Sequence, residues 1–424
     1  MKNTRGIILL FIANSISTIA QGISMIAIPW YFVQQEMFPT YTKFFIFANI
    51  VVLFWVPYCG VIIDKYNRKK IFLVANLISA IILISVAGYG LANDGLPWIY
   101  VACIFGMTFM NYNIHYPNLY AFVQEITEPD QYGKITSYLE IQGQLSSVLA
   151  GAGAAILLEG IEKGPQEVLG LNINIPFTVP AWNIEDIFLM DGLTYIVSFV
   201  IISFISYQSL KGGKVESGSI LTRLKSGIAY FKKYPEVFIF GVASYCVFVV
   251  VILEGFLLGA KYVAAHLEGG GDMYAISDIF YSIGAFVAGI AINTIFRRIK
   301  APTALIILTL MTAALIFTLY ATKQAIFLYS MLFILGLTNA GGRIIRTTFL
   351  FKKIPNHVFG RAASLFNMTN VIFRIFFVSI FSLAYFDKGN NIIYTFLILS
   401  IFLLLAAIVL ITNKSAIINS KSVS

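Results

Sequence analysis

Three ionisable residues lie inside long apolar runs, where a charge is costly. Glu254 follows Val250-Val-Ile-Leu, Asp278 lies near the start of another apolar run, and Arg374 lies in the middle of a third. A charge at the centre of a membrane-spanning helix costs about 2.5–3.5 kcal/mol or more, so such residues usually serve a function. A buried carboxyl can bind and release a proton as its surroundings change. Glu254 and Asp278 are therefore the predicted proton-coupling residues, and the alternative for Glu254 is a structural ion pair or an acid that lines the mouth.

Arg374 belongs to a polar face of its predicted helix. Asn367, Asn370 and Arg374 recur at spacings of three and four residues, which places them on one face of a helix. The guanidinium of Arg374 could hold an anionic group of a substrate, such as a phosphate. It could equally pair permanently with an acid such as Glu254, and the sequence leaves both interpretations open. Asn370 and Arg374 are predicted substrate-binding residues.

Other polar residues form similar faces within apolar runs. Each predicted face lies on one helix: Asn111, His115 and Asn118; Ser137, Glu140, Gln144 and Ser147; Asn339 and Arg343. These faces should point to the interior of a bundle and not to lipid, which makes Gln144 a further candidate for substrate binding. Their simplest alternative role is to hold helices together by hydrogen bonds, each worth up to about 1–2 kcal/mol.

The composition requires lipid around most of the chain. Of 424 residues, 58% are hydrophobic and 12% are charged, whereas soluble proteins have about 45–50% and about 25%. Alternation with a period of two is absent from the long apolar runs, so the runs are predicted to be helices. The sequence thus predicts an all-α membrane protein with twelve transmembrane helices, at about 7–33, 43–63, 71–91, 98–122, 136–158, 187–207, 237–261, 274–296, 301–321, 325–347, 362–386 and 391–412.

The distribution of basic residues orients the helices. Between the predicted spans, 23 of the 29 Lys and Arg residues lie on one side and five on the other, with Arg374 inside a span. Because loops on the cytoplasmic side are rich in Lys and Arg, both termini should be cytoplasmic and the protein should lie in the cell membrane. The net charge of +9 follows from this pattern and does not indicate a nucleic-acid partner.

Several classes of function have no support in the sequence. The three cysteines and three histidines show no spacing of a metal site or disulfide framework. A nucleotide-binding loop is absent, and so is an arrangement typical of a membrane hydrolase. We therefore expect no cofactor, no metal and no enzymatic activity. The expected partners are a small-molecule substrate, membrane lipids and protons as a coupling ion, with the chain acting as a monomer.

The chain divides into two similar halves. A bundle of six spans at 1–207 precedes a cytoplasmic linker at 208–236, which contains an amphipathic helix, and a second bundle occupies 237–424. Gly60-Val-Ile-Ile-Asp64, followed by Arg68, recurs 229 residues later as Gly289-Ile-Ala-Ile-Asn293, followed by Arg297. Parallel six-helix repeats around a central cavity are typical of one large class of transporters.

The loop after the second span carries a more specific likeness. Gly60-Val-Ile-Ile-Asp64-Lys65-Tyr-Asn-Arg68-Lys-Lys resembles the G-x-x-x-D-R-x-G-R-[RK] loop of the major facilitator superfamily. This resemblance implies a gate at the cytoplasmic face, in which Asp64 and Arg68 form a charge network with Glu125 as the acceptor. Lys65 belongs to the same loop, and Asn293 and Arg297 are its counterparts in the second half. Anchoring of the lysines to anionic lipid is the alternative.

The resemblance also implies which residues face the substrate. In this superfamily the first and fourth spans of each half usually line the cavity, which selects Gln21, Asn111, His115, Tyr245, Glu254, Asn339 and Arg343. For His115, a hydrogen-bonded histidine inside the bundle is the competing interpretation.

Shorter segments are similar to one branch of the superfamily. Ala27-Ile-Pro-Trp-Tyr31 and Gly360-Arg-Ala-Ala-Ser364 resemble the enterobactin exporter and macrolide efflux pumps. The expected function is thus a secondary active transporter that uses alternating access and exports a small amphipathic molecule, such as a siderophore, a macrolide or another drug, coupled to protons. A lysophospholipid or lipid translocator, or a nutrient importer of the same fold, is the alternative. The run after Leu145 lacks the proline of the span-5 motif common in drug–proton antiporters, which weakens the expectation of antiport.

Overall fold

The computed structural model describes residues 3–128, 131–168, 171–207, 220–296 and 298–420. Six long helices form the N-terminal half: α1 (Thr4–Gln34), α2 (Phe38–Lys65), α3 (Arg68–Ala92), α4 (Trp98–Ile126), α5 (Tyr132–Glu159) and α6 (Ile184–Ser203). After α7 (Ile220–Lys233), the C-terminal half contains α8 (Pro235–Leu253), α9 (Gly259–Tyr262), α10 (Gly271–Ile295), α11 (Ala301–Ala321), α12 (Ala325–Lys353), α13 (Asn356–Phe381), α14 (Ala384–Asp387), α15 (Ile393–Thr412) and α16 (Lys414–Asn419).

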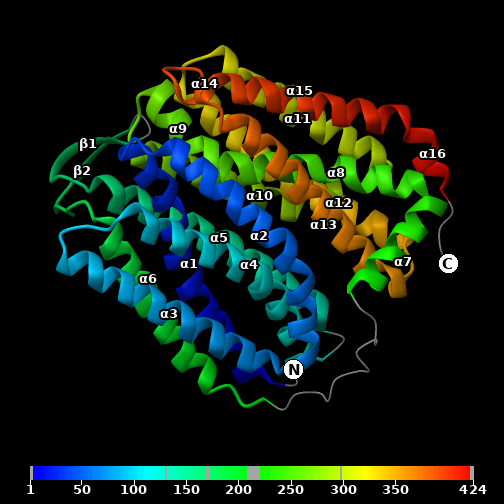
Figure 1. Cartoon of the computed structure of the whole chain (residues 1–424), viewed down its shortest axis with the longest axis horizontal. Coiled ribbons are helices and arrows are strands. Elements are labelled where there is room, and N and C mark those ends of the chain that lie inside the picture. The colour runs from blue at the N-terminus through cyan, green and yellow to red at the C-terminus, as the bar shows by residue number, and fades with distance from the viewer. Residues whose placement is uncertain (1–2, 129–130, 169–170, 208–219, 297, 421–424) are drawn as a thin grey trace.

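Eleven spans of the described chain are long and apolar enough to cross a membrane. Helix α4 is the twelfth long helix, and it misses this criterion because Asn111, Asn113, His115 and Asn118 reduce the hydropathy of its second half. The predicted fold class, an all-α membrane protein with twelve helices in two halves, is confirmed. Both chain ends and α7 lie at one end of the bundle (Figure 1), which we call the termini end. The opposite end, which carries strands β1 and β2, is the hairpin end.

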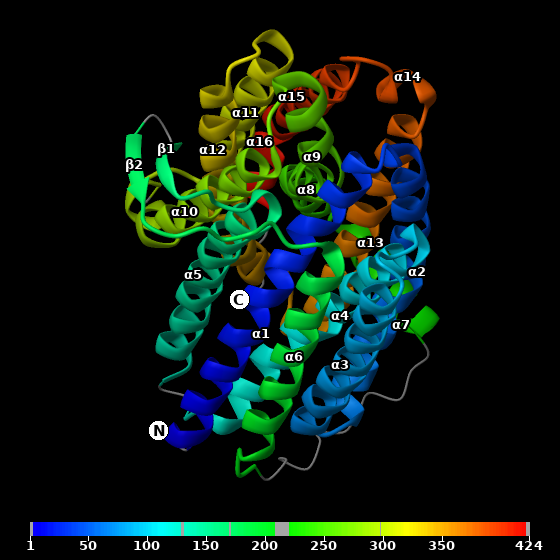
Figure 2. The ribbon, with the colours of Figure 1, turned by 90° about the vertical axis from the view of Figure 1, so that its left-hand side faces the viewer.

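The two halves diverge from the hairpin end towards the termini end. In Figure 1 the helices of the N-terminal half slope away from those of the C-terminal half. Figure 2, which looks onto the hairpin end, shows α1, α3 and α6 along their length but α8, α11 and α15 more nearly end-on. The halves pack against each other mainly through α5 with α10 and through α2 with α13.

Glycines permit two of the closest helix contacts. A Cβ atom on Gly284 of α10 would overlap the Phe333 carbonyl oxygen of α12, so only glycine allows this crossing within the C-terminal half. Across the interface, a Cβ atom on Gly151 of α5 would lie 2.7 Å from Cγ1 of Ile279 on α10. Small residues thus let these backbones approach closely, as expected where lipid gives helices no hydrophobic reason to associate.

Two spans end at other residues than predicted. The span expected to run to residue 386 ends at Phe381, because the chain is extended at Leu383 before it enters α14. The span expected to end at residue 347 continues to Lys353. The connection between the spans predicted at 136–158 and 187–207 contains the antiparallel strands β1 (Gly164–Val168) and β2 (Leu171–Ile175).

The predicted span at 237–261 is longer and less regular than expected. It continues to Leu267 through two π-helical turns, η2 (Glu254–Leu258) and η3 (Val263–Leu267), on either side of α9. A π turn bonds each amide to the carbonyl five residues earlier, and such turns occur frequently at functional sites. Glu254 begins the first of them.

Helix α7 packs on the C-terminal half. The Phe231 side chain is buried between Phe238 and Phe366, and the Tyr230 hydroxyl donates a hydrogen bond of 2.7 Å to the Lys353 carbonyl. These two aromatic residues of α7 therefore face the C-terminal half of the protein.

Candidate functional site

Contacts between the two halves concentrate at the hairpin end. The Tyr41 hydroxyl donates a hydrogen bond of 2.5 Å to the Phe256 carbonyl, and a Glu159 carboxylate oxygen accepts one of 2.6 Å from the Gly271 amide. The rings of Trp30 and Tyr274 stack with their centroids 6.3 Å apart. These contacts hold α1, α2 and α5 against the π-helical span and α10, so the hairpin end is closed.

An aromatic plug lies just below these contacts. The Phe256 ring packs edge-on against Phe105 and Phe109 of α4, at centroid distances of 6.5 and 6.1 Å. We call these three residues the aromatic plug. Their rings fill the interface with apolar atoms, which excludes water between the halves at this depth.

A bridging ion pair marks the interface nearer the termini end. Arg343 of α12 donates a hydrogen bond of 3.0 Å to Glu140 of α5, and the Tyr120 hydroxyl donates one of 2.6 Å to the other carboxylate oxygen. The Arg343 and Glu140 side chains are 52% and 43% exposed. Glu140 lies eight residues, or about 12 Å, from the end of its helix, so half-exposed side chains at this depth indicate an opening between the halves.

Arg374 lies between the plug and this ion pair. Its guanidinium carbon is 5.7 Å from the centre of the Phe109 ring across the interface. The residue is only 6% exposed, and its Nε atom has no hydrogen-bond partner in the described structure. Among the residues described, Arg374 has no ion pair, so the alternative in which it pairs with Glu254 is not observed in this structure.

Glu254 and Asp278 lie close enough to interact electrostatically. Glu254 is 5% exposed, and a Cβ atom on Gly259 would lie 2.8 Å from its carboxylate oxygen. Neither carboxyl makes a hydrogen bond or ion pair within the described residues. The structural ion pair considered for Glu254 is therefore absent from this part of the chain. Two buried carboxyls that share a region cannot both carry a charge cheaply, which favours binding of a proton.

The remaining predicted substrate-binding residues of the C-terminal half form two small clusters. Asn339 donates a hydrogen bond of 2.7 Å to the Tyr281 hydroxyl. Asn370 donates one of 3.4 Å to the Tyr245 carbonyl, and the Tyr245 ring packs on the guanidinium of Arg346 at 3.5 Å. The clusters join α10 to α12 and α8 to α12 and α13, so they position the walls of the pathway.

In the N-terminal half, His115 belongs to a chain of hydrogen bonds. Its Nε2 atom is 2.9 Å from the Asn14 side-chain oxygen, and the Asn14 amide donates a bond of 2.7 Å to Gln142. This chain joins α1, α4 and α5, in line with the interpretation of His115 as a satisfied histidine. Asn111 lies beside Tyr195. Gln21 and Gln144 are partly exposed and make no side-chain hydrogen bond in the described structure.

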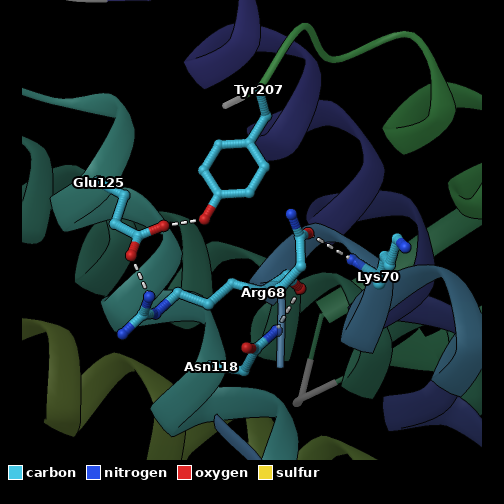
Figure 3. Close-up of polar contacts among 6 residues, drawn as sticks. Arg68, Lys70, Asn118, Glu125 and Tyr207 are labelled. Atoms are coloured by element: carbon cyan, nitrogen blue, oxygen red, sulfur yellow. Dashed lines mark hydrogen bonds and ion pairs between the residues drawn. The ribbon is translucent and has the colours of Figure 1, made fainter. Parts of the chain in front are cut away.

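At the termini end, Arg68 pairs with Glu125 as the sequence predicted. Figure 3 shows the Arg68 guanidinium and the Tyr207 hydroxyl both directed at the Glu125 carboxylate. Asn118 donates a hydrogen bond of 3.0 Å to the Arg68 carbonyl. Asn67, which replaces the glycine of the family loop, caps α3 by accepting a bond from the Lys70 amide. All of these residues belong to the N-terminal half.

The structure gives less information about the other predicted gating residues. Lys65 is exposed at the end of α2, beside the Tyr66 ring. Asp64 and Asn293 lie at corresponding helix ends, but their side chains are outside the described structure, and so is Arg297.

Sequence reasoning missed two acidic residues. Glu140 was assigned to a polar face but not to the site, although it bridges the halves. Asp191 of α6 is 1% exposed and accepts a hydrogen bond of 2.8 Å from Ser24, and its second oxygen has no partner in the described chain. An acid inside the apolar run 187–207 was the signal that could have revealed Asp191.

A separate cavity of about 520 Å³ opens at the hairpin end of the N-terminal half. Its walls include Trp30, Tyr31, Trp182 and Glu185. The predicted substrate-binding residues do not line it, so it is distinct from the pathway between the halves.

Two six-helix halves that close on one side and separate on the other around buried charges define a membrane transporter. The family model of the Major Facilitator Superfamily matches residues 10–378, and the chain belongs to that superfamily. The match indicates a transporter and not an enzyme. None of the curated proteins matches the chain.

Solved structures agree on the fold. A point mutant of the nucleoside transporter NupG is 12% identical with a TM-score of 0.72, over 96% of this chain and 99% of that one. A D-xylose–proton symporter is 12% identical with a TM-score of 0.69, over 95% and 97%. A bacterial homologue of the iron transporter ferroportin, in its inward-facing state, is 14% identical with a TM-score of 0.68, over 97% and 99%. These different substrates leave the cargo of this chain open.

Proposed function

We propose that the chain is a secondary active transporter that works by alternating access and exports a small amphipathic molecule in exchange for protons. The observation that carries the proposal is the position of the contacts between the halves. In the described residues, hydrogen bonds at the hairpin end join Tyr41 to Phe256 and Glu159 to Gly271, whereas the bridging ion pair lies nearer the termini end and is half exposed.

The orientation belongs to the same proposal. The excess of Lys and Arg at the termini end makes that end cytoplasmic in the cell membrane. The structure then corresponds to an inward-facing state, in which the pathway is open to cytoplasmic substrate. One chain contains both halves and therefore the whole pathway, which supports a monomer.

Each residue group has a proposed role. Glu254 and Asp278 carry the proton, since they are unpaired and close together. Arg68 and Glu125, with Asp64, Lys65, Asn293 and Arg297, control the cytoplasmic side. The pathway is lined by Gln21, Asn111, His115, Gln144, Tyr245, Asn339, Arg343, Asn370 and Arg374. The aromatic plug and the tyrosines nearby suit a cargo with an apolar body, such as a siderophore or a macrolide.

Flux into inverted vesicles tests the function. Vesicles that contain the protein receive a siderophore, a macrolide or a lysophospholipid, each with and without a proton gradient. We expect gradient-driven accumulation of one of the first two and its loss in Glu254→Gln. The exposed Asp94→Asn serves as the control for removal of one acid. Flux without dependence on the gradient would contradict proton coupling.

A lysophospholipid translocator is the second candidate. Arg343 and Arg374 on the C-terminal side of the pathway support it, because guanidinium groups bind phosphate well. Accumulation of the lysophospholipid alone would select this function over export of a drug or siderophore.

A further inference from the structure

A buried guanidinium without a partner is the feature that the fold leaves unexplained. Arg374 keeps its charge under all ordinary conditions, since arginine does not lose its proton in proteins. It is 6% exposed, and its Nε atom bonds to nothing in the described structure. Leaving one buried charge without its partner is strongly destabilising, so a residue in this state needs a counter-charge that arrives from elsewhere.

The protein does not supply that counter-charge. Arg374 has no ion pair within the described chain, although three acids occupy the same region. Glu140 pairs with Arg343, while Glu254 and Asp278 interact with each other and not with Arg374. The Phe109 ring at 5.7 Å is the contact shown by the guanidinium, and its face attracts a cation without neutralising it.

A second buried arginine, Arg346, makes different contacts. Arg346 is equally buried and its Nε atom also lacks a partner in the described structure, but its guanidinium donates a hydrogen bond of 2.9 Å to the Ser244 carbonyl and stacks on Tyr245. Both partners of Arg346 belong to the C-terminal half, so its contacts are those of a structural residue. The Arg374 guanidinium instead faces Phe109 of the N-terminal half. The interface between these two residues must separate when the hairpin end opens.

Two kinds of group lie near Arg374, one apolar and one polar. The aromatic plug lies on one side and offers apolar rings. On the other side, Tyr112 of α4 is within electrostatic reach of Arg374, Arg343 and Glu140, and it is half-exposed. A ligand with an anionic group at Arg374 and an apolar body against the rings would contact both kinds of group.

We infer that the cargo is an amphipathic anion whose carboxylate or phosphate group binds Arg374. This inference rests on the proposed function and names its substrate class. The planar guanidinium can bind either group through two parallel hydrogen bonds. Arg343 lies further along the pathway towards the termini end, so the anion meets Arg343 first. Because Arg343 is already paired with Glu140, the anion is held by the unpaired Arg374.

Equilibrium binding of matched probes tests the inference. The purified protein in nanodiscs of zwitterionic lipid is titrated with 1-naphthyl phosphate, 2-naphthoate, 2-naphthalenemethanol and 2-naphthylmethylammonium. These probes share one ring system and differ in charge. We expect both anions to bind and the neutral and cationic probes to bind at least about tenfold more weakly, the factor that corresponds to loss of one charged hydrogen bond. Equal binding of the neutral probe would overturn the inference.

Variants assign the anion to one residue. Arg374→Gln should weaken both anions about tenfold or more, and Arg374→Lys should retain part of the affinity, because it keeps the charge but not the fork. Arg298→Gln removes an exposed positive charge outside the pathway and should bind as the unchanged protein does. Unchanged affinity in Arg374→Gln would refute the assignment.

The unfolding temperature without ligand separates a binding role from a structural one. If Arg374 awaits a ligand, Arg374→Gln removes an uncompensated charge and should unfold at the same or a higher temperature. Arg346→Gln, which loses the bond to Ser244, should unfold at a lower temperature. A fall in Arg374→Gln equal to that in Arg346→Gln would make Arg374 structural and contradict the inference.

The source of the anion is resolved by two further titrations. Tighter binding of lysophosphatidic acid than of 1-naphthyl phosphate assigns the site to a lipid headgroup, and the reverse order assigns it to a soluble anion. Inorganic phosphate alone should bind more weakly than either. Because these measurements need no flux, anion binding without transport would reject the proposed function alone, and transport of neutral solutes alone would reject the anion.

Discussion

Arg343 of α12 donates a hydrogen bond of 3.0 Å to Glu140 of α5, and this ion pair joins the two halves nearer the termini end. Both side chains are about half exposed, so the pair contributes little to stability, at most about 1 kcal/mol. A contribution of that size is nevertheless enough to bias an equilibrium between two conformations by a factor of about five.

Glu140→Gln should therefore shift the conformational equilibrium and leave the fold intact. The expected result is a severalfold increase in the population that is open at the hairpin end, because the described conformation loses a contact between the halves. Spin labels on the hairpin-end segments of α2 and α10 report the distance. The exchanged pair Glu140→Arg with Arg343→Glu should restore the original distribution, and an unchanged population in Glu140→Gln would show that the pair does not link the halves.

Phe256→Ala should loosen the hairpin end more strongly. The substitution removes the ring that packs against both Phe105 and Phe109, whereas the Tyr41 bond to the Phe256 main chain remains. We expect water to reach the pathway from the hairpin end, detected as faster alkylation of a cysteine introduced at Asn339. Phe204→Ala, an exposed residue at the termini end, is the control and should leave the alkylation rate unchanged.

Glu254→Gln should abolish the coupling of transport to protons and leave binding of the cargo largely intact. The amide keeps the size of the carboxyl but cannot take up a proton, so flux should lose its dependence on the proton gradient while the affinity for cargo changes little. Asp278→Asn, at the neighbouring carboxyl, should reduce the same dependence. Flux measured across a range of pH checks both variants, and a Glu254→Gln profile identical to that of the unchanged protein would remove Glu254 from the coupling step.

Arg68→Gln should destabilise the N-terminal half. It removes the guanidinium that pairs with the mostly buried Glu125 carboxylate, whereas the Tyr207 hydroxyl still donates a hydrogen bond to that carboxylate. Losing one member of a buried pair costs about 3–5 kcal/mol, and partial exposure of Arg68 reduces the expected cost to about 1–3 kcal/mol. Thermal unfolding measures the loss. Tyr207→Phe, which keeps the charges, should lose less than Arg68→Gln, and the opposite order would contradict the ion pair as the main contact.

The fold was accessible from the sequence because lipid imposes a strong and simple constraint. Every backbone group must bond within its own helix, so the apolar runs revealed the long helices, α4 included despite its polar second half. The strands β1 and β2 left a weaker signal outside the membrane. The alternation of Leu171-Asn-Ile-Asn-Ile175 is typical of a strand, but it lies between predicted spans, where the apolar runs give no information.

The site was accessible only in part. Helical spacing places Glu140 and Arg343 on polar faces but does not show which half each face meets, so the bridge between them could not be foreseen. Helical spacing also left open whether Arg374 pairs with Glu254, because it does not show whether two helices bring these side chains into direct contact. A π turn rotates every later side chain of the helix relative to a regular α-helix. The sequence around Glu254 has no pattern that predicts such a turn.

The two hydrogen bonds that close the hairpin end are chemically one-sided. The N-terminal half contributes side chains, the Tyr41 hydroxyl and the Glu159 carboxylate, while the C-terminal half contributes main-chain atoms of Phe256 and Gly271. Alanine at Phe256 would keep the main-chain acceptor, whereas a Cβ atom at Gly271 would lie 2.9 Å from the Glu159 carboxylate oxygen and crowd the second bond. Related chains could therefore change the residue at 256 and still form the first bond, provided that the tyrosine stays, but the second bond requires the glycine together with the glutamate opposite it.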